Sequence, residues 1–213
     1  MNATAQIATA TPRAHVRAAA AAAAPGAPIS PNRLGERAGQ LEQMSNAELE
    51  TVFLRGITPD VDRLVGWEFR GTNTPPWMRL VANKKFVKGM FRNAAGDVYG
   101  YNCPVVQNRL DEPWITRPHD ARPTRFGFYK VVHVDAAARD NLYLHARLLD
   151  YGRGGGAIYD VTRGLRDYLV QVDPRDPDLF LGKAYYAVGP ARVFTNFFVL
   201  ERHRTGLGAL QNP

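Results

Sequence analysis

The alternation of apolar and polar positions predicts a chain built mostly from β-strands. Short apolar and aromatic stretches with a period of two recur along the chain, separated by Gly, Pro, Asn and Asp, which are typical of turns. The expected strands cover residues 65–70, 83–91, 98–106, 125–134, 141–151, 157–161, 165–172, 179–188 and 192–203. This pattern favours a mainly β (α+β) fold, an antiparallel β-barrel or strongly curved sheet of about eight or nine strands.

One amphipathic helix is predicted in front of these strands. Ser45 and Glu48 have the spacing of a capping box, and Met44 and Leu49 have that of a hydrophobic staple. Gly56 is a typical helix stop, and the apolar positions 49, 52 and 53 fall on one helical face. We therefore expect a single N-terminal helix that lies against the sheet and caps it.

The chain divides into one domain and two tails. Residues 1–43 are rich in Ala and Pro and are expected to be disordered. Residues 44–204 form the expected barrel domain, and residues 205–213 form a flexible C-terminal tail. No apolar run approaches the roughly 18 residues of a membrane helix. A cytoplasmic location is expected, and secretion through the alanine-rich start is the alternative.

Composition narrows the chemistry only slightly. The formal net charge of +7 favours acidic surfaces or ligands without specifying any. Cys103 is the one cysteine, which excludes an intramolecular disulfide and a cysteine-based zinc site. The sequence shows no catalytic signature, and we expect no metal, no cofactor and no catalytic residue.

Three stretches together resemble a known group of sequences. They are the helix with Gly66-Trp67-Glu68-Phe69-Arg70-Gly71, Trp77 with Asn83-Lys84-Lys85-Phe86, and the segments Ala157-Ile158-Tyr159-Asp160, Leu165-Arg166-Asp167-Tyr168 and Phe197-Phe198-Val199-Leu200-Glu201-Arg202. The combination resembles the bacterial GXWXG-type proteins of uncharacterised function over residues 44–204. Phe69 occupies the place of that family's central Trp, and Trp67 lies two positions earlier.

A more remote likeness is to the calycin barrels, which include the lipocalins. In that group a late Arg packs across the Trp of the first strand, and an apolar ligand commonly lies inside the barrel. The resemblance implies structural roles for Trp67 and Phe69, with the guanidinium of Arg202 or Arg204 stacked on Trp67.

A predicted hairpin supplies most of the candidate binding residues. If the turn between residues 134 and 141 closes it, His133 faces His145, and Tyr129, Tyr143 and Arg147 share their face. This face either lines a pocket and orients the polar group of a ligand, or is the outer face of the sheet. A haem or metal site would need only one or two of the histidines.

Two further groups are candidates for chemistry. Tyr159-Asp160 completes the predicted ligand site, and Asp167-Tyr168 has the same pair of residue types. One of the two carboxylates could act as a general base if it is desolvated. The alternative is that these residues lie in turns and edge strands. A basic run with interleaved Phe residues fits either single-stranded nucleic acid or a solvated strand face. That run contains Arg79, Lys84, Lys85, Lys88 and Arg92.

Together these patterns predict a non-catalytic barrel that binds an apolar or amphipathic small molecule, such as a fatty-acid-like or lipid-like compound. One alternative is an enzyme that acts on a lipid-like or polyketide-like substrate through His133, His145 or Asp160. The other is an interaction protein with a solid core. Nucleic acid is not the expected partner, and the sequence specifies neither the ligand nor the oligomeric state.

Overall fold

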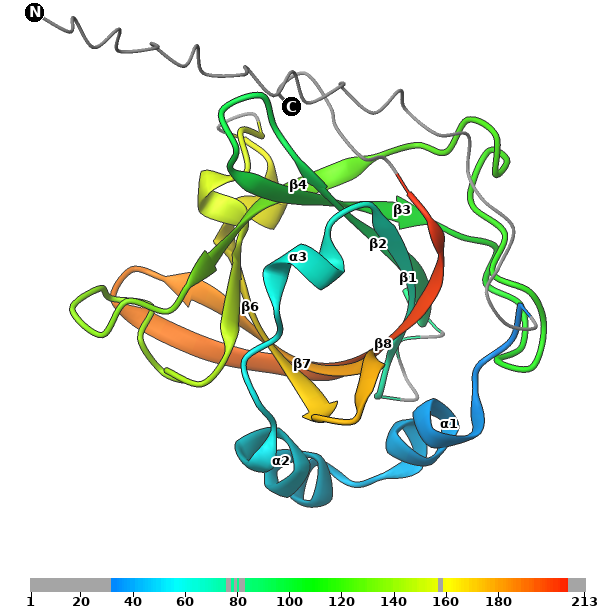
Figure 1. The fold of residues 1–213 in the computed structure, drawn as a ribbon, viewed down its shortest axis with the longest axis horizontal. Coiled ribbons are helices and arrows are strands. Elements are labelled where there is room, and N and C mark those ends of the chain that lie inside the picture. Colours follow the sequence, from blue (N-terminus) through cyan, green and yellow to red (C-terminus); the bar gives the residue numbers. More distant parts are fainter. Residues whose placement is uncertain (1–31, 76–77, 79, 81–82, 157–158, 207–213) are drawn as a thin grey trace, which may run out of the picture.

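Strands of the described chain close into one antiparallel barrel (Figure 1). The computed structural model describes residues 32–75, 78, 80, 83–156 and 159–206. Within them the barrel order is β1 to β8 without a crossover. The strands are β1 Trp67–Asn73, β2 Lys85–Arg92, β3 Val98–Pro104, β4 Phe126–His133, β5 Arg147–Asp150, β6 Leu165–Asp173, β7 Asp176–Val188 and β8 Ala191–Thr205.

The first and last strands close the ring. β1 pairs with β2, where Glu68 faces Gly89, and on its other edge with β8, where Gly71 faces Leu200. Each strand is therefore hydrogen-bonded on both edges, which removes the exposed edges of an open sheet. The prediction of a mainly β antiparallel barrel is confirmed, and the barrel is closed.

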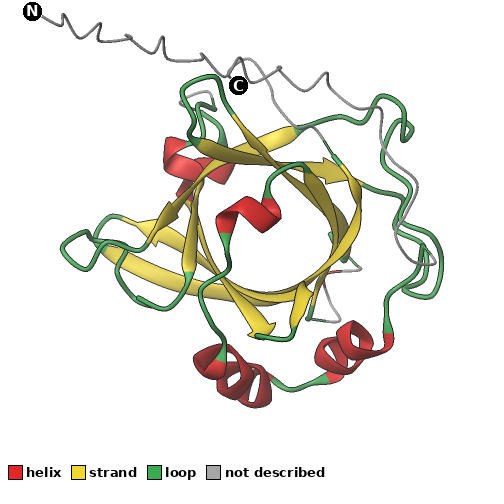
Figure 2. Ribbon diagram, in the orientation of Figure 1, coloured by secondary structure: helices red, strands yellow, loops and turns green. Residues whose placement is uncertain are grey.

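Two helices lie outside the barrel wall (Figure 2). α2, Asn46–Arg55, begins with the predicted capping box: the Ser45 backbone N–H donates to the Glu48 carboxylate at 2.8 Å, and the Ser45 hydroxyl accepts from the Glu48 N–H. α1, Glu36–Gln43, falls in the stretch predicted to be disordered. That prediction is wrong for these residues because Leu41 packs with the apolar face of α2 against the barrel. The 3₁₀ turns η2, Tyr151–Arg153, and η3, Val161–Gly164, precede β6.

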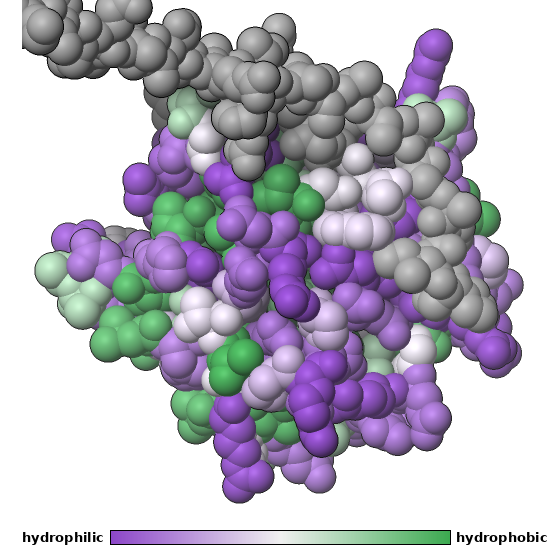
Figure 3. Space-filling model, viewed as in Figure 1, coloured by the Kyte–Doolittle hydropathy of each residue, from purple (hydrophilic) through white to green (hydrophobic). Residues whose placement is uncertain are grey.

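A third helix, α3 at Val61–Leu64, lies across one end of the barrel (Figure 1). Leu64 is fully buried and joins the apolar cluster inside the barrel. The space-filling view from this end shows side chains where the ribbon leaves a gap (Figure 3). Trp67 follows α3, and the guanidinium carbon of Arg202 lies 4.5 Å from its ring centroid. Arg202 thus makes the stacking contact expected of it or of Arg204, whereas Arg204 pairs with Glu68.

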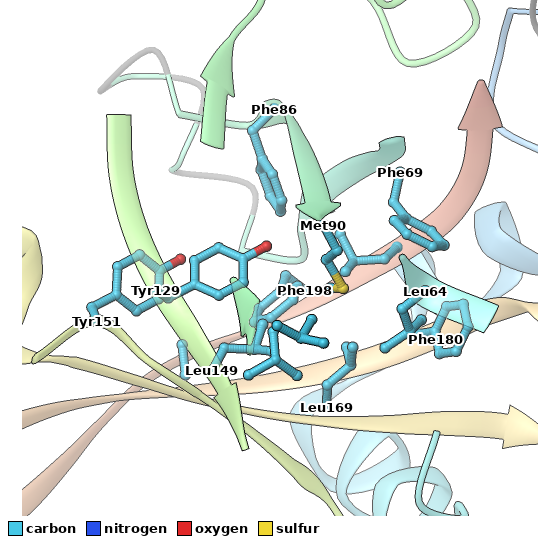
Figure 4. Close-up of a cluster of buried hydrophobic side chains, with 14 residues drawn as sticks. Leu64, Phe69, Phe86, Met90, Tyr129, Leu149, Tyr151, Leu169, Phe180 and Phe198 are labelled. Carbon is cyan, nitrogen blue, oxygen red and sulfur yellow. The ribbon is translucent and has the colours of Figure 1, made fainter. Parts of the chain in front are cut away.

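The core has three parts. One apolar cluster fills the barrel beside α3, a second lies between the outer wall and helices α1 and α2, and a third lies outside around Trp114. The interior cluster includes Phe69, Met90, Leu169 and Phe180 (Figure 4). The barrel is therefore solid at its α3 end. None of the described helices has the length and apolarity to cross a membrane.

Several predicted elements differ or lie outside the described residues. The strand expected at 141–151 is reduced to Arg147–Asp150, because residues 135–146 form turns and a loop. The strand expected at 157–161 is absent from its described part, where Val161 begins η3. Residues 1–31 of the predicted N-terminal tail and residues 207–213 of the predicted C-terminal tail lie outside the described residues.

Candidate functional site

A pocket of about 200 Å³ opens at the barrel end opposite α3. β1 runs from Trp67 at the α3 end to Asn73 at the pocket, so the two ends are structurally distinct. Its walls combine apolar and aromatic side chains with a similar number of polar ones. The lining residues are Asn73, Asn83, Phe86, Lys88, Asn102, Phe126, Tyr151, Thr162, Leu165, Asp167, Ala184, Asn196 and Phe198.

Two glycines keep aromatic rings against the wall and out of the pocket. A Cβ on Gly182 would lie 2.0 Å from the ring of Phe198, and one on Gly71 would lie 2.2 Å from the ring of Phe86. The two rings meet edge to face, with centroids 6.0 Å apart. Because each ring occupies space that a side chain would otherwise fill, the barrel retains a pocket at this end.

The floor of the pocket carries a buried polar cluster. The Lys88 ammonium donates to the Asn102 side-chain oxygen at 2.9 Å, to Asp167 Oδ2 at 3.2 Å, and to the Tyr151 hydroxyl. The Tyr151 hydroxyl in turn donates to Asp167 Oδ2 at 3.2 Å. Lys88 and Asp167 expose only 4% and 5% of their side chains, so this ion pair is enclosed by protein.

Aromatic rings surround the cluster from several strands. Lys88 Nζ lies 4.8 Å from the ring centroid of Tyr129, 5.1 Å from that of Tyr151 and 5.3 Å from that of Phe198. Figure 4 shows the two tyrosines and Phe198 among the side chains that meet inside the barrel. The ring faces carry partial negative charge and so favour a cation among them.

Burial shifts the proton affinities of the cluster toward neutral forms. Burial raises the pKa of Asp167, and the attraction and hydrogen bond of Lys88 offset part of that increase. Burial likewise lowers the pKa of Lys88, against the opposing effect of Asp167. Burial and the nearby Asp167 carboxylate raise the pKa of Tyr151 well above its ordinary value. A buried ion pair and a phenol are therefore joined by hydrogen bonds at the pocket floor, and burial opposes the charged form of each group.

Asp167 has one carboxylate oxygen left over. Oδ2 accepts the hydrogen bonds of Lys88 and Tyr151, whereas Oδ1 is buried and has no hydrogen-bond partner among the described residues. A buried acceptor without a partner is costly, and such atoms in native proteins commonly serve a ligand, water or ion. Asp167, which lines the pocket, thus keeps one unused acceptor that is enclosed by protein.

The residues predicted from sequence to bind a ligand lie in four separate places. Tyr129 is fully buried inside the barrel, with its ring centroid 5.0 Å from that of Tyr151. His133 is exposed and Arg147 is buried near the α3 end, where the Arg147 guanidinium donates to the Pro59 carbonyl at 3.0 Å. Tyr143 and His145 lie outside the barrel wall.

The remaining four predicted residues are two that pack against α2 outside the barrel and two that precede η3. Tyr143 and His145 both contact Phe53 of α2, and His145 Nε2 lies 3.2 Å from the Phe53 carbonyl oxygen. Tyr159 is 90% exposed. Asp160 caps η3 by accepting from the Thr162 N–H at 2.9 Å. Of the seven, only Tyr129 adjoins the polar cluster.

The irregular connection before β5 explains why these residues do not share one face. His133 pairs with Arg147, and His145 lies before β5, so the expected pairing of His133 with His145 is wrong. A shift of two residues leaves the facing of β4 unchanged. However, residues 143 and 145 lie in the connection before β5, where the chain packs against α2.

The basic run is largely buried. Lys85 Nζ lies 3.7 Å from the Trp114 ring centroid and donates to the Arg109 and Glu112 carbonyls, each at 2.9 Å. Lys84 Nζ donates to the Asn73 carbonyl at 2.5 Å. With Lys88 inside the barrel, the interpretation of this run as a solvated or nucleic-acid-binding face is wrong for these three lysines.

The cluster could have been recognised by its period of two. Phe86, Lys88 and Met90 share one face of β2, which places a lysine between two core residues. Asp167 likewise lies between Leu165 and Leu169 on β6. The sequence singled out Asp167 as a possible base, but no local signal pairs it with Lys88, because β2 and β6 are far apart along the chain.

The described residues include no group of three or more His, Cys, Asp or Glu side chains arranged to hold a metal ion. The comparisons with known proteins add no family: no protein-family model matches the sequence, and no curated protein matches it significantly. The functional argument therefore rests on the pocket and its polar floor.

Proposed function

We propose that this barrel binds a compact, largely apolar molecule through a neutral polar group. The observation that carries the proposal is the polar cluster of Lys88, Asp167, Tyr151 and Asn102 at the floor of a pocket that three Phe side chains also line. Ligand pockets typically combine apolar walls with a few convergent polar groups. The presence of an interior pocket favours ligand binding over a solid-core interaction protein.

The pocket volume sets the size of the ligand. An apolar cavity of about 150 Å³ can hold benzene, so about 200 Å³ suits a small ring or short chain with one functional group. A long acyl chain would need to extend past the opening. Within the lipid-like class expected from the sequence, the geometry therefore favours compact molecules.

The charge of the floor sets the polarity of the ligand. Lys88 and Asp167 carry opposite charges and pair with each other, so the cluster as a whole is neutral. A ligand carboxylate would meet the Asp167 carboxylate, and a ligand ammonium would meet Lys88. Because an additional buried charge without its own partner is costly, a ketone or hydroxyl group fits better than either.

The likeness to the calycin barrels supports the same proposal. The stacking of Arg202 on Trp67 at the closed end and the open pocket at the other end agree with a calycin-like ligand-binding barrel. We therefore also propose that the chain is related to the calycin barrels and, distantly, to the GXWXG-type proteins.

Binding is tested with matched phenylpropyl probes that differ in their polar group. The probes are benzylacetone and its alcohol, hydrocinnamate, and phenylpropylamine, measured by saturation-transfer NMR and by thermal melting. We expect the ketone and the alcohol to raise the melting temperature by about 5 °C or more near saturation, and the charged probes to bind at least about tenfold more weakly. Failure of both neutral probes to bind would overturn the proposal.

A pair of variants locates the binding. Ala184 lines the pocket, so Ala184→Phe fills it; Ala187 lies on the same strand outside the pocket lining, so Ala187→Phe is the matched control. Loss of probe binding in the first variant alone supports the site. Equal loss or equal retention in both would place the probe elsewhere.

A further inference from the structure

The two oxygens of Asp167 have different surroundings, and this difference indicates reactivity as well as binding. Oδ2 is held by Lys88 and Tyr151, each at 3.2 Å, so the carboxylate is fixed in place. Oδ1 is buried, has no hydrogen-bond partner in the described parts of the chain, and belongs to a residue that lines the pocket. A bound molecule that reaches the floor would therefore lie beside a fixed carboxylate that keeps one acceptor unused.

We propose that Asp167 is the general base of a proton-transfer reaction on a compact carbonyl compound bound in this pocket. The proposal rests on the proposed binding function and adds an activity to it. The substrate class is a small ketone or aldehyde that carries a hydrogen on the carbon next to its carbonyl group.

The reaction needs no other reactant. The Asp167 carboxylate takes the proton from the carbon next to the carbonyl, and the electron pair of the broken C–H bond forms a C=C bond. The carbonyl π electrons move to its oxygen, which gives an enolate and a protonated Asp167. Return of the proton to the same carbon gives exchange or racemisation. When a double bond is conjugated with the enolate, return to its far carbon gives an isomer.

Lys88 is placed to stabilise the enolate. Its ammonium is the cation at the pocket floor, 3.2 Å from Asp167 Oδ2, and its hydrogen bonds to Asn102 and Tyr151 keep it in place. A charge that develops on the substrate oxygen in a buried site is stabilised more strongly by a fixed cation than it would be in water. The pair therefore offers a base and an electrostatic partner in one cluster.

The surroundings increase the strength of the base. Burial raises the pKa of Asp167, so its carboxylate accepts a proton more readily than an exposed aspartate does. The rings of Phe86 and Phe198 form an apolar wall beside the floor. Such a wall limits the water available to solvate the carboxylate and the enolate.

The test follows hydrogen–deuterium exchange of benzylacetone in D₂O by proton NMR. We expect the protein to accelerate loss of the signals next to the carbonyl above the rate in buffer at the same pD. Asp167→Asn, which preserves size, is expected to lower the protein-dependent rate by about 10²–10⁴-fold. The matched control is Asp97→Asn, because Asp97 forms an ion pair with Lys130 at 2.9 Å outside the pocket, and it should retain the wild-type rate.

Two additional arms keep the result interpretable if Asp167→Asn does not fold. Ala184→Phe retains the aspartate but fills the pocket beside it, because Ala184 is the cross-strand neighbour of Asp167, and it should abolish the exchange, whereas Ala187→Phe should retain it. Treatment with borohydride during turnover tests for a covalent imine on Lys88. An adduct on Lys88 would overturn the assignment of Asp167 as the base, because the lysine amine would then activate the carbonyl itself.

Binding and exchange are measured on the same samples, so the two proposals can fail separately. Benzylacetone that binds in the pocket without faster exchange would overturn the catalytic proposal and leave the binding function intact. Exchange that persists in folded Asp167→Asn would also overturn it. Failure of all neutral probes to bind would overturn the proposed function and the activity with it.

Discussion

The Lys88 ammonium and the Asp167 carboxylate lie 3.2 Å apart inside the barrel, although they come from β2 and β6, which are not neighbours in the sheet. The pair spans the interior and connects opposite parts of the wall. Removing two charges from water is expensive, and their attraction compensates only when the geometry is good and the remaining hydrogen bonds are made. Here Asn102 and Tyr151 supply those hydrogen bonds to Lys88, and Tyr151 donates to Asp167 Oδ2, whereas Asp167 Oδ1 has no partner among the described residues.

Removal of one member of the pair is expected to destabilise the protein strongly. Lys88→Met leaves a buried carboxylate without its cation, and we expect the free energy of unfolding to fall by about 3–5 kcal/mol. The double variant Lys88→Met/Asp167→Leu should recover much of that loss, because both charges are gone. Denaturant unfolding measures each value.

The control is Lys130→Met, which removes a lysine from the more exposed Asp97 pair and should lower the free energy of unfolding by less than about 1 kcal/mol. An equal loss in both single variants would contradict this expectation.

The sequence predicts the architecture better than the site because the two depend on different ranges of interaction. The capping box of Ser45 and Glu48 and the period-two strands are local patterns, and both are present in the structure. α1 was missed because its short apolar face, with Leu41, has meaning only against the barrel wall. The pairing of Lys88 with Asp167 depends on barrel closure, which no local pattern specifies.

Whether a side chain faces the inside or the outside of the barrel was predicted correctly where the strand is regular and wrongly where the chain is irregular. Tyr129 lies on a regular stretch of β4 and faces the interior, as the alternation requires. Tyr143 and His145 lie in the connection before β5, so the period of two does not apply to them. The stacking of Arg202 on Trp67 joins residues far apart in sequence, and it was expected only because a family resemblance supplied it.

A single methyl group at Gly182 is expected to reduce ligand binding by narrowing the pocket. The Cβ of Gly182→Ala would lie 2.0 Å from the Phe198 ring, so the ring must move away from the wall, into the space it borders. We expect benzylacetone affinity to fall at least about tenfold and stability to fall by about 1–3 kcal/mol. Saturation-transfer NMR and thermal melting measure the two effects. Gly39→Ala is the control, because its Cβ meets no atom within 4 Å.

The thiol of Cys103 is expected to be unreactive in the folded protein. Burial, followed by the nearby Glu68 carboxylate, raises the pKa of this thiol to about 12. At pH 8 the thiolate fraction is then about 10³-fold lower than for an ordinary cysteine, before restricted access is counted. Reaction with a chromogenic disulfide should therefore be slow in buffer and fast in guanidinium. Since Cys103 is the one cysteine of the chain, the signal has a single source. Rapid reaction of the folded protein would contradict its burial.

Stability is expected to fall below pH 6.5 because His203 is buried in its neutral form. His203 is fully buried on β8, and neither ring nitrogen has a hydrogen-bond partner among the described residues. Burial, then the positive charges of Arg204 and Arg70, lowers the pKa of His203 to about 3. The unfolded chain therefore binds a proton near pH 6.5 that the folded chain does not. This contribution to stability is complete above pH 6.5 and is lost as the pH falls toward 3.

The loss from His203 should reach about 1.5–2 kcal/mol between pH 6.5 and pH 5, approaching a slope of about 1.4 kcal/mol per pH unit. Denaturant unfolding at several pH values measures it. His203→Phe cannot take up the proton, so its stability should vary by that much less over the same interval. His119 is exposed, and His119→Phe should keep the wild-type slope. If His203→Phe and the wild type lose stability in parallel, the histidine must be protonated in the folded barrel, which its burial between two arginines opposes.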